Sequence, residues 1–317
     1  MDNLTPQIEF RVAGFTPNDN AHKFVLQIIQ PAMVQMELTN GDVRKIVIAD
    51  NDHYGAAIKE FAPNEGYTND GIYQGVGKIL PQIENSCYAG SNLVLHVCVI
   101  GGFAAVDDDR PAGEGDAMRY GIYHELGHCA DYRRRQVQHV SKAREGNTSL
   151  VLRCAEGNSA TLLSEYAACF FSASFLTPEG FAFVADSTAA NLTRYLKELT
   201  EKRDRYRLRL LDLRIVRDAA METFWRSMIE FSKLFAYLRG NPALAVDGKA
   251  ALVWPGASQV GSEEIQLMAV ALHEAWNSYP NCAEAFEQTL TGTWFAISKA
   301  EGYRFEVQSD GDYLWLD

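Results

Sequence analysis

Two histidines four positions apart, His124 and His128, set the strictest geometric requirement in this 317-residue chain, within the run His124-Glu125-Leu126-Gly127-His128. On an α-helix, side chains at this spacing lie on the same face, one turn apart. Both imidazoles can then reach one zinc ion at about 2.0–2.1 Å. Glu125 follows the first histidine, so its carboxylate can lean toward a water on the metal without being a ligand. The run therefore predicts a helix that carries a zinc site, with Glu125 as the general base.

The residues around this motif predict a small sheet with helices. Strand-like patterns, either alternating or almost wholly apolar, occur in three segments: residues 7–13, 43–49 and 92–100. A helix is expected over 21–38, because Asn18-Asp19-Asn20 offers an N-cap. The motif helix should run from about residue 116 to residue 138. Residues 50–90 are rich in glycine, asparagine and proline and show no strong period.

The second half of the chain predicts helices and a closing hairpin. A helix with Ser159 as its N-cap should follow a break at Gly157-Asn158. Residues 187–239 contain neither proline nor glycine, and their apolar residues recur in steps of three and four. This pattern is typical of one long helix, or two nearly collinear ones, with a coiled-coil-like seam. Two further elements are expected: a helix over 262–278 and a hairpin over 303–316.

The amino-acid composition restricts which partners and which cellular compartment we expect. Hydrophobic residues make up 47% of the chain, enough for a large core, and the net charge of −12 argues against nucleic acids and anionic membranes as partners. The first residues do not resemble a signal peptide, and no apolar run approaches the roughly 20 residues of a membrane span. Six cysteines are scattered without a Cys-x-x-Cys pair, as expected of reduced thiols. We therefore expect a cytoplasmic protein.

A catalytic zinc needs a third protein ligand and one open position. A third histidine at the spacing His-x-x-Gly-x-x-His is excluded, because Asp131 and Arg134 stand at those positions. Glu165 is the best candidate, since it is a carboxylate in an otherwise apolar, alanine-rich helical stretch. A buried carboxylate without a cation would be costly. The small residues that follow it, Ala168 and Cys169, should let this helix pack closely on the motif helix. Gly127, inside the motif, also lets another backbone approach closely.

Two alternatives to this ligand stay open. Glu165 could instead pair with an arginine such as Arg133 or Arg153. Glu156 is the second choice as the ligand, although the Gly157-Asn158 break stands beside it.

The motif His124-Glu125-x-x-His128, followed by Glu165 on a downstream helix, resembles the gluzincin group of zinc metallopeptidases over roughly residues 5–175. The resemblance implies that His124, His128 and Glu165 hold zinc, and that Glu125 is the general base. It also implies an upper lobe in which an edge strand binds the substrate as an added strand. Several gluzincins place an aspartate four residues after the ligand glutamate to orient an imidazole. Here that position is Cys169, so the support is expected from Asp131 or a backbone carbonyl.

The expected fold class is α+β. A zincin-like upper lobe over residues 1–180 would contain a small mixed sheet, the motif helix and the Glu165 helix. A mainly helical lower lobe over residues 181–317 would contain the long helix and the C-terminal hairpin. The long helix at 187–239 could also dock a protein partner or a second copy of the chain.

The expected function is hydrolysis of peptide bonds in peptide or protein substrates, with Zn²⁺ as cofactor. Such a protease also needs a donor for the oxyanion, and three residues are candidates: His273, Tyr166 and Tyr279. An ordinary, partly buried role is the alternative for His273. Two rival interpretations remain: a non-catalytic zinc-binding regulatory protein on a peptidase-like fold, and a protein without metal in which the histidines are structural.

Overall fold

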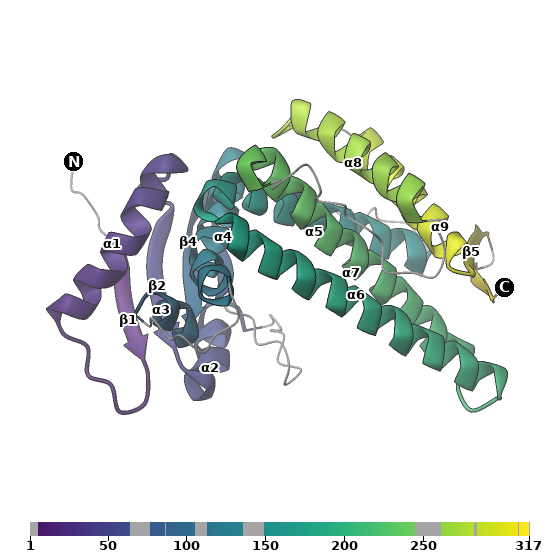
Figure 1. Ribbon diagram of the computed structural model, residues 1–317, viewed down its shortest axis with the longest axis horizontal. Coiled ribbons are helices and arrows are strands. Elements are labelled where there is room, and N and C mark those ends of the chain that lie inside the picture. The colour runs from purple at the N-terminus through teal and green to yellow at the C-terminus, as the bar shows by residue number, and fades with distance from the viewer. Residues whose placement is uncertain are drawn as a thin grey trace. The chain divides into compact units, whose positions relative to one another are not determined.

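The computed structural model describes most of the chain, in the following ranges: residues 6–63, 77–85, 87–104, 113–135, 149–244, 261–281, 284–309 and 311–316. The fold is α+β, with a four-stranded mixed sheet and a separate two-stranded sheet (Figure 1). The chain forms two compact units. The first comprises Met1–Gln138, Ala167–Val184 and Tyr237–Ala245, and the second comprises His139–Tyr166, Ala185–Ala236 and Val246–Asp317. The predicted division into an upper lobe over residues 1–180 and a lower lobe over residues 181–317 stays a prediction.

The first unit is built on the mixed sheet, with strand order β1-β2-β4-β3. Its strands are β1 (Gln7–Arg11), β2 (Val43–Ala49), β3 (Gly77–Glu84) and β4 (Cys87–His96). Its helices include α1 (Asp19–Gln35), α2 (Asn51–Phe61), α3 (Val97–Ala104) and the motif helix α4 (Glu114–Arg135). Strands β1, β2 and β4 are parallel, whereas β3 is antiparallel to β4. Among the described residues, β3 is therefore an edge strand.

Helices cover both faces of this sheet. Ile46 and Ile48 of β2 belong to one apolar core together with residues of α1 and with Leu126 of α4. Val47, between them in sequence, belongs to a second core with Tyr54 of α2. Side chains alternate along a strand, so β2 is buried on both faces and the motif helix lies on the same face as α1.

The predicted strands over 7–13 and 43–49 are confirmed, with β1 ending at Arg11. The third predicted strand, over residues 92–100, was wrong over residues 97–100, because β4 ends at His96 and α3 begins at Val97. The backbone amide of Cys98 donates to Nδ1 of His96 at 3.2 Å, which caps the first turn of α3. A continuous apolar run fits a buried strand and a buried helix equally well. Neither α2 nor β3 was predicted, since residues 50–90 have no clear period.

The motif helix is confirmed as α4, although its expected end at residue 138 lies outside the described residues. The following helix, α5 (Leu150–Ser172), begins earlier than expected and runs through Gly157-Asn158, so the predicted break there was wrong. The side-chain amide of Asn158 donates to the carbonyl of Cys154 at 2.8 Å. This asparagine therefore bonds back onto its own helix instead of ending it.

The long helix expected over 187–239 is two helices, α6 (Pro178–Arg207) and α7 (Leu213–Gly240). They run antiparallel as a hairpin, so the prediction of near-collinear helices was wrong (Figure 1). Arg209 has a left-handed backbone with φ 60°, and the amide of Leu210 donates to the carbonyl of Arg205 at 2.8 Å. This is a Schellman end. Asp212 then caps α7 by accepting from the amide of Arg214 at 2.7 Å.

The remaining elements are α8 (Gly261–Asn277), α9 (Glu284–Ala300), β5 (Tyr303–Gln308) and β6 (Gly311–Leu316), with single 3₁₀ turns at Ala173–Phe175 and Pro242–Leu244. The expected helix over 262–278 and the closing hairpin are confirmed, and β5 and β6 pair antiparallel. Helix α9 was not predicted. In the part of the chain that the structure describes, no helix is long and apolar enough to cross a lipid bilayer.

Candidate metal centre

The structure brings His124 and His128 of α4 together with Glu165 of α5. One ligand atom from each of the three side chains lies within 4.8 Å of the other two. Ligand atoms around a tetrahedral zinc with bonds of about 2.0–2.1 Å are roughly 3.3 Å apart. The group could hold a metal ion, and the predicted carboxylate is the third member.

A glycine permits the helix contact on which this group depends. A Cβ placed on Gly127 would clash with the backbone carbonyl oxygen of Ala168. The backbones of α4 and α5 therefore touch at this point, as the sequence predicted. Glu165 lies just under one turn before Ala168 on the same continuous helix. The contact therefore helps to fix Glu165 relative to the motif histidines.

The two histidines differ in burial and in neighbours. Their ring centroids are 4.8 Å apart, with the ring planes nearly perpendicular at 81°. His128 is buried and stacks on Tyr132, whereas His124 is partly exposed. The sulfur of Cys169 lies 3.5 Å from Nδ1 of His124. Its position suits a partner that orients the imidazole.

Cys169 belongs to a buried polar cluster. The hydroxyl of Tyr120 is hydrogen-bonded to that of Ser172, and both Tyr120 and Tyr237 are buried beside Cys169. Burial raises the pKa of both tyrosines well above the ordinary value, so both stay neutral donors. Two neutral tyrosines therefore lie beside the sulfur that faces His124.

Asp131, the support suggested by the sequence, lies in a different environment. Its carboxylate forms a buried ion pair with Arg135, one turn further along α4. Both side chains are almost fully inaccessible to solvent. The attraction between the two charges therefore offsets part of the cost of removing both from water. The prediction that Asp131 orients a motif histidine stays a prediction.

Glu125 is buried against the start of the edge strand. It is 7% exposed, and a Cβ on Gly77, the first residue of β3, would lie 2.5 Å from its Cγ. Burial raises the pKa of Tyr54, and the nearby negative charge of Glu125 raises it further. The carboxylate thus lies near both β3 and α2. The sequence did not reveal Gly77 or Tyr54 as neighbours, because the segment that holds them has no periodic pattern.

Glu165 has a cationic neighbour on α7. The Nζ atom of Lys233 is 3.3 Å from Oε2 of Glu165 and 3.1 Å from Oε1 of Glu230. An arginine partner was the alternative to metal ligation for Glu165. The cation found beside it is Lys233, and Arg133 lies 3.7 Å from Asp42. The side chain of the second-choice ligand, Glu156, lies outside the described residues.

The three candidates for the oxyanion donor lie in different settings. Tyr166 is buried with its ring centroid 5.4 Å from that of Trp276, and Tyr279 stacks on the same indole at 4.4 Å. His273 is exposed on α8. The aromatic packing gives both tyrosines a structural role. A catalytic role for any of the three stays a prediction.

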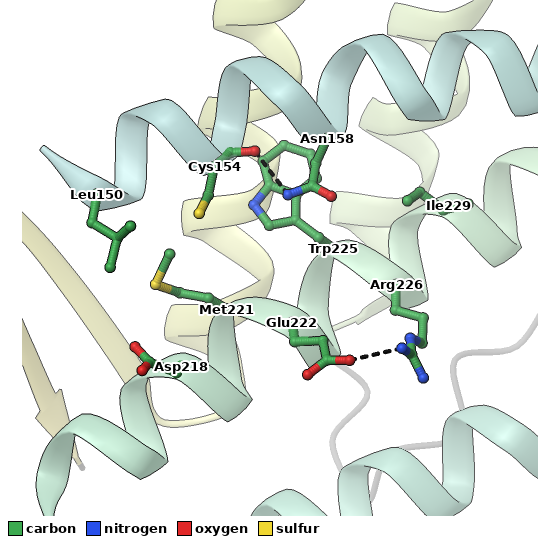
Figure 2. Close-up of a pocket in the computed structure, with 9 residues that line it drawn as sticks. All are labelled: Leu150, Cys154, Asn158, Asp218, Met221, Glu222, Trp225, Arg226 and Ile229. Carbon is green, nitrogen blue, oxygen red and sulfur yellow. Dashed lines mark hydrogen bonds and ion pairs between the residues drawn. The ribbon is translucent and has the colours of Figure 1, made fainter. Parts of the chain in front are cut away.

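A separate cavity of about 490 Å³ lies within the second unit, between α5 and α7 (Figure 2). Its lining residues are Leu150, Cys154, Asn158, Asp218, Met221, Glu222, Trp225, Arg226 and Ile229. Within the described residues, the buried indole nitrogen of Trp225 has no hydrogen-bond partner. Among the described residues, no group of three metal-ligating side chains lines this cavity. The histidine pair with Glu165 is therefore the stronger candidate for a functional centre.

No protein family, curated protein or solved structure matches this chain. What the protein does must therefore be inferred from the chemistry of its own residues.

Proposed function

We propose that this protein is a zinc-dependent metallopeptidase with a zincin-like fold of gluzincin type. The observation that carries the proposal is the grouping of His124, His128 and Glu165, together with the buried Glu125 that follows His124 in the chain. Two imidazoles and one carboxylate are the donor set of many hydrolytic zinc sites, and three protein ligands leave a position for substrate or water. Imidazole ligands also favour zinc over magnesium or calcium, which prefer oxygen. When bound, zinc would polarise a carbonyl and lower the pKa of a water molecule.

Glu125 would perform the proton transfers. Its carboxylate follows a ligand histidine and would accept a proton from the attacking water, then donate it to the leaving amine. Burial limits the water around it, and a proton held there is shielded from exchange with bulk solvent. The contact between Glu125 and Gly77 supports this role, because it restricts where the carboxylate can move.

The edge strand supports a peptide as the substrate. Strand β3 begins against Glu125 and, in the described part of the sheet, pairs on one side only, with β4. An extended peptide could add to its other side through backbone hydrogen bonds and would then pass the general base. This geometry favours peptide bonds over small soluble esters or amides as the bonds cleaved.

The Glu125→Gln variant tests this function. The substitution keeps the size of the side chain and removes the base, so zinc should stay bound while hydrolysis of a peptide library falls by roughly 10²–10⁴-fold. Zinc should be measured by elemental analysis of protein purified without a histidine tag. Full activity in Glu125→Gln would overturn the mechanism. Zinc binding without hydrolysis by the wild-type chain would favour the rival, a non-catalytic zinc-binding protein.

A further inference from the structure

The turn between α6 and α7 lies at the end of the helical hairpin (Figure 1). Large apolar side chains are exposed at this turn. Leu208 is 70% exposed, Leu210 64% and Ile215 48%. Single exposed leucines are common on protein surfaces. Several neighbouring ones at the same turn indicate a contact surface.

The same turn concentrates positive charge. Residues 205–217 contain five arginines against one aspartate, a net charge of +4, in a chain whose total is −12. Arg217 pairs with Asp218 at 2.8 Å. Within the described residues, no carboxylate lies within ion-pair distance of Arg205, Arg209 or Arg214. These charges are thus available to an anionic partner.

The backbone of the turn is held in place before any partner arrives. The Schellman end at Arg209 and the cap at Asp212 satisfy backbone groups that the two helices would otherwise leave open. Leu208 and Leu210 flank Arg209, so both leucines are carried by a defined turn. Little ordering entropy would be lost when they bind.

Two aromatic side chains of the C-terminal hairpin border this turn. A cavity of about 560 Å³ is lined by residues 212–214 and Arg217 on one side and by residues 312–315 on the other. Trp315 is 48% exposed and Tyr313 37%. The guanidinium of Arg304 lies over the Trp315 ring, 5.6 Å from its centroid. We call residues 205–217 together with Tyr313 and Trp315 the basic tip.

We infer that the basic tip binds the surface of a lipid bilayer rich in anionic headgroups. Arginines pair with lipid phosphates, leucines enter the boundary of the acyl chains, and tryptophan and tyrosine favour the headgroup level. The overall charge of −12 does not prevent this, since charges farther away than the Debye length of about 8 Å are screened at physiological salt. The inference does not depend on the metal centre.

The chemistry of the basic tip distinguishes a bilayer from other anionic partners. A nucleic acid would use the arginines but leave the leucines in water. A stable protein interface usually buries about 800 Å² on each partner, in a packed patch. A narrow turn with leucines between arginines suits a fluid interface, into which a few side chains can insert.

Vesicle sedimentation with the full-length chain tests the inference. The wild-type protein should sediment with phosphatidylcholine vesicles that contain phosphatidylserine, should not sediment with pure phosphatidylcholine vesicles, and should be released by high salt. Each arginine near an anionic surface strengthens binding roughly fivefold, so Arg205→Gln/Arg209→Gln/Arg214→Gln should weaken it roughly hundredfold. Leu208→Ser/Leu210→Ser should weaken it on the order of tenfold.

Matched control variants remove arginines and apolar side chains outside the basic tip. The side chains of Arg44, Arg119 and Arg226 are each 41% exposed, so Arg44→Gln/Arg119→Gln/Arg226→Gln makes the same change in net charge away from the basic tip. Leu267 and Val270 of α8 are 56% and 55% exposed, so Leu267→Ser/Val270→Ser is the apolar control. Both controls should keep most of the vesicle binding.

Three results would overturn the inference. The first is failure of the wild-type chain to sediment with phosphatidylserine vesicles. The second is an equal loss of vesicle binding in the tip variants and in the control variants. The third is an oligomer, detected by light scattering, that the tip substitutions dissociate although the wild-type protein does not bind vesicles. The last result would assign the basic tip to protein contacts.

Discussion

The sulfur of Cys169 lies 3.5 Å from Nδ1 of His124, one turn of α5 beyond Glu165. An imidazole nitrogen that faces a hydrogen-bond partner leaves the other nitrogen, here Nε2, for a metal. A thiol therefore faces this nitrogen, and the carboxylate of Asp131 pairs with Arg135 instead. Because a thiol is a weak donor and its sulfur a weak acceptor, we expect Cys169 to orient His124 through a weak hydrogen bond.

Replacing Cys169 should weaken metal binding. In Cys169→Ala, His124 loses this partner, and zinc affinity should fall by roughly tenfold, as for other outer partners of metal ligands. Cys129→Ala is the matched control, since it removes the same group from an equally buried position on α4. Competition with a chromophoric chelator measures both affinities. Equal affinities for the two variants would show that Cys169 does not hold His124.

The helix contact at Gly127 should tolerate no larger residue. Gly127→Ala places a Cβ against the carbonyl oxygen of Ala168, and the free energy of unfolding should fall by about 1–3 kcal/mol. Gly115, in the first turn of α4, has open space at the same position, so Gly115→Ala should raise stability by about 0.5–1 kcal/mol. Urea unfolding compares the two. Equal stability of both variants would contradict the close packing of α4 on α5.

A methyl group at Gly77 should impair catalysis without removing the metal. The new Cβ of Gly77→Ala would lie 2.5 Å from Cγ of Glu125 and displace that carboxylate. Since the three ligand residues are untouched, zinc content should be unchanged while kcat for peptide hydrolysis falls at least about tenfold. Steady-state kinetics and elemental analysis on the same sample separate the two effects. A loss of zinc, or an unchanged kcat, would refute this role for the start of β3.

Acid should weaken one charge network on the sheet. Glu9 accepts from Arg11 at 2.6 Å and pairs with Lys45 at 2.6 Å, and these two cations lower its pKa from 4.5 to about 2, Arg11 being the larger cause. Because the folded-state pKa is the lower one, this contribution to stability is complete above about pH 4.5 and is lost as the pH falls toward 2. The difference in melting temperature between wild type and Glu9→Gln should therefore shrink over that range. A difference independent of pH would show that Glu9 is not ionised in the network.

The grouping of metal-ligating side chains could be predicted from the sequence because helical spacing fixes it locally. His124 and His128 share a face through the period of the helix alone. Glu165 stood out as a carboxylate among alanines and leucines, and Gly127 predicted the close approach of another backbone. These inferences rest on the period of a helix and on the composition of short stretches, both of which can be read from the sequence.

Other parts of the fold depend on contacts that no local pattern reveals. The hairpin between α6 and α7 turns at Arg209, a residue with no preference for the left-handed conformation it adopts. The apolar run that ends β4 continues into α3 without a change in composition. Lys233 and Gly77 reach Glu165 and Glu125 only through the folded chain, so their contacts with the site could not be foreseen.

The zinc content of two glutamine variants tests the central claim most directly. Glu165→Gln removes the proposed carboxylate ligand, whereas Glu230→Gln removes the other carboxylate that pairs with Lys233. Elemental analysis of tag-free protein after dialysis should find zinc equimolar with the chain in the wild type and in Glu230→Gln, and little zinc in Glu165→Gln. A wild-type chain without zinc, or a Glu165→Gln variant that keeps it fully, would contradict the proposed metal centre.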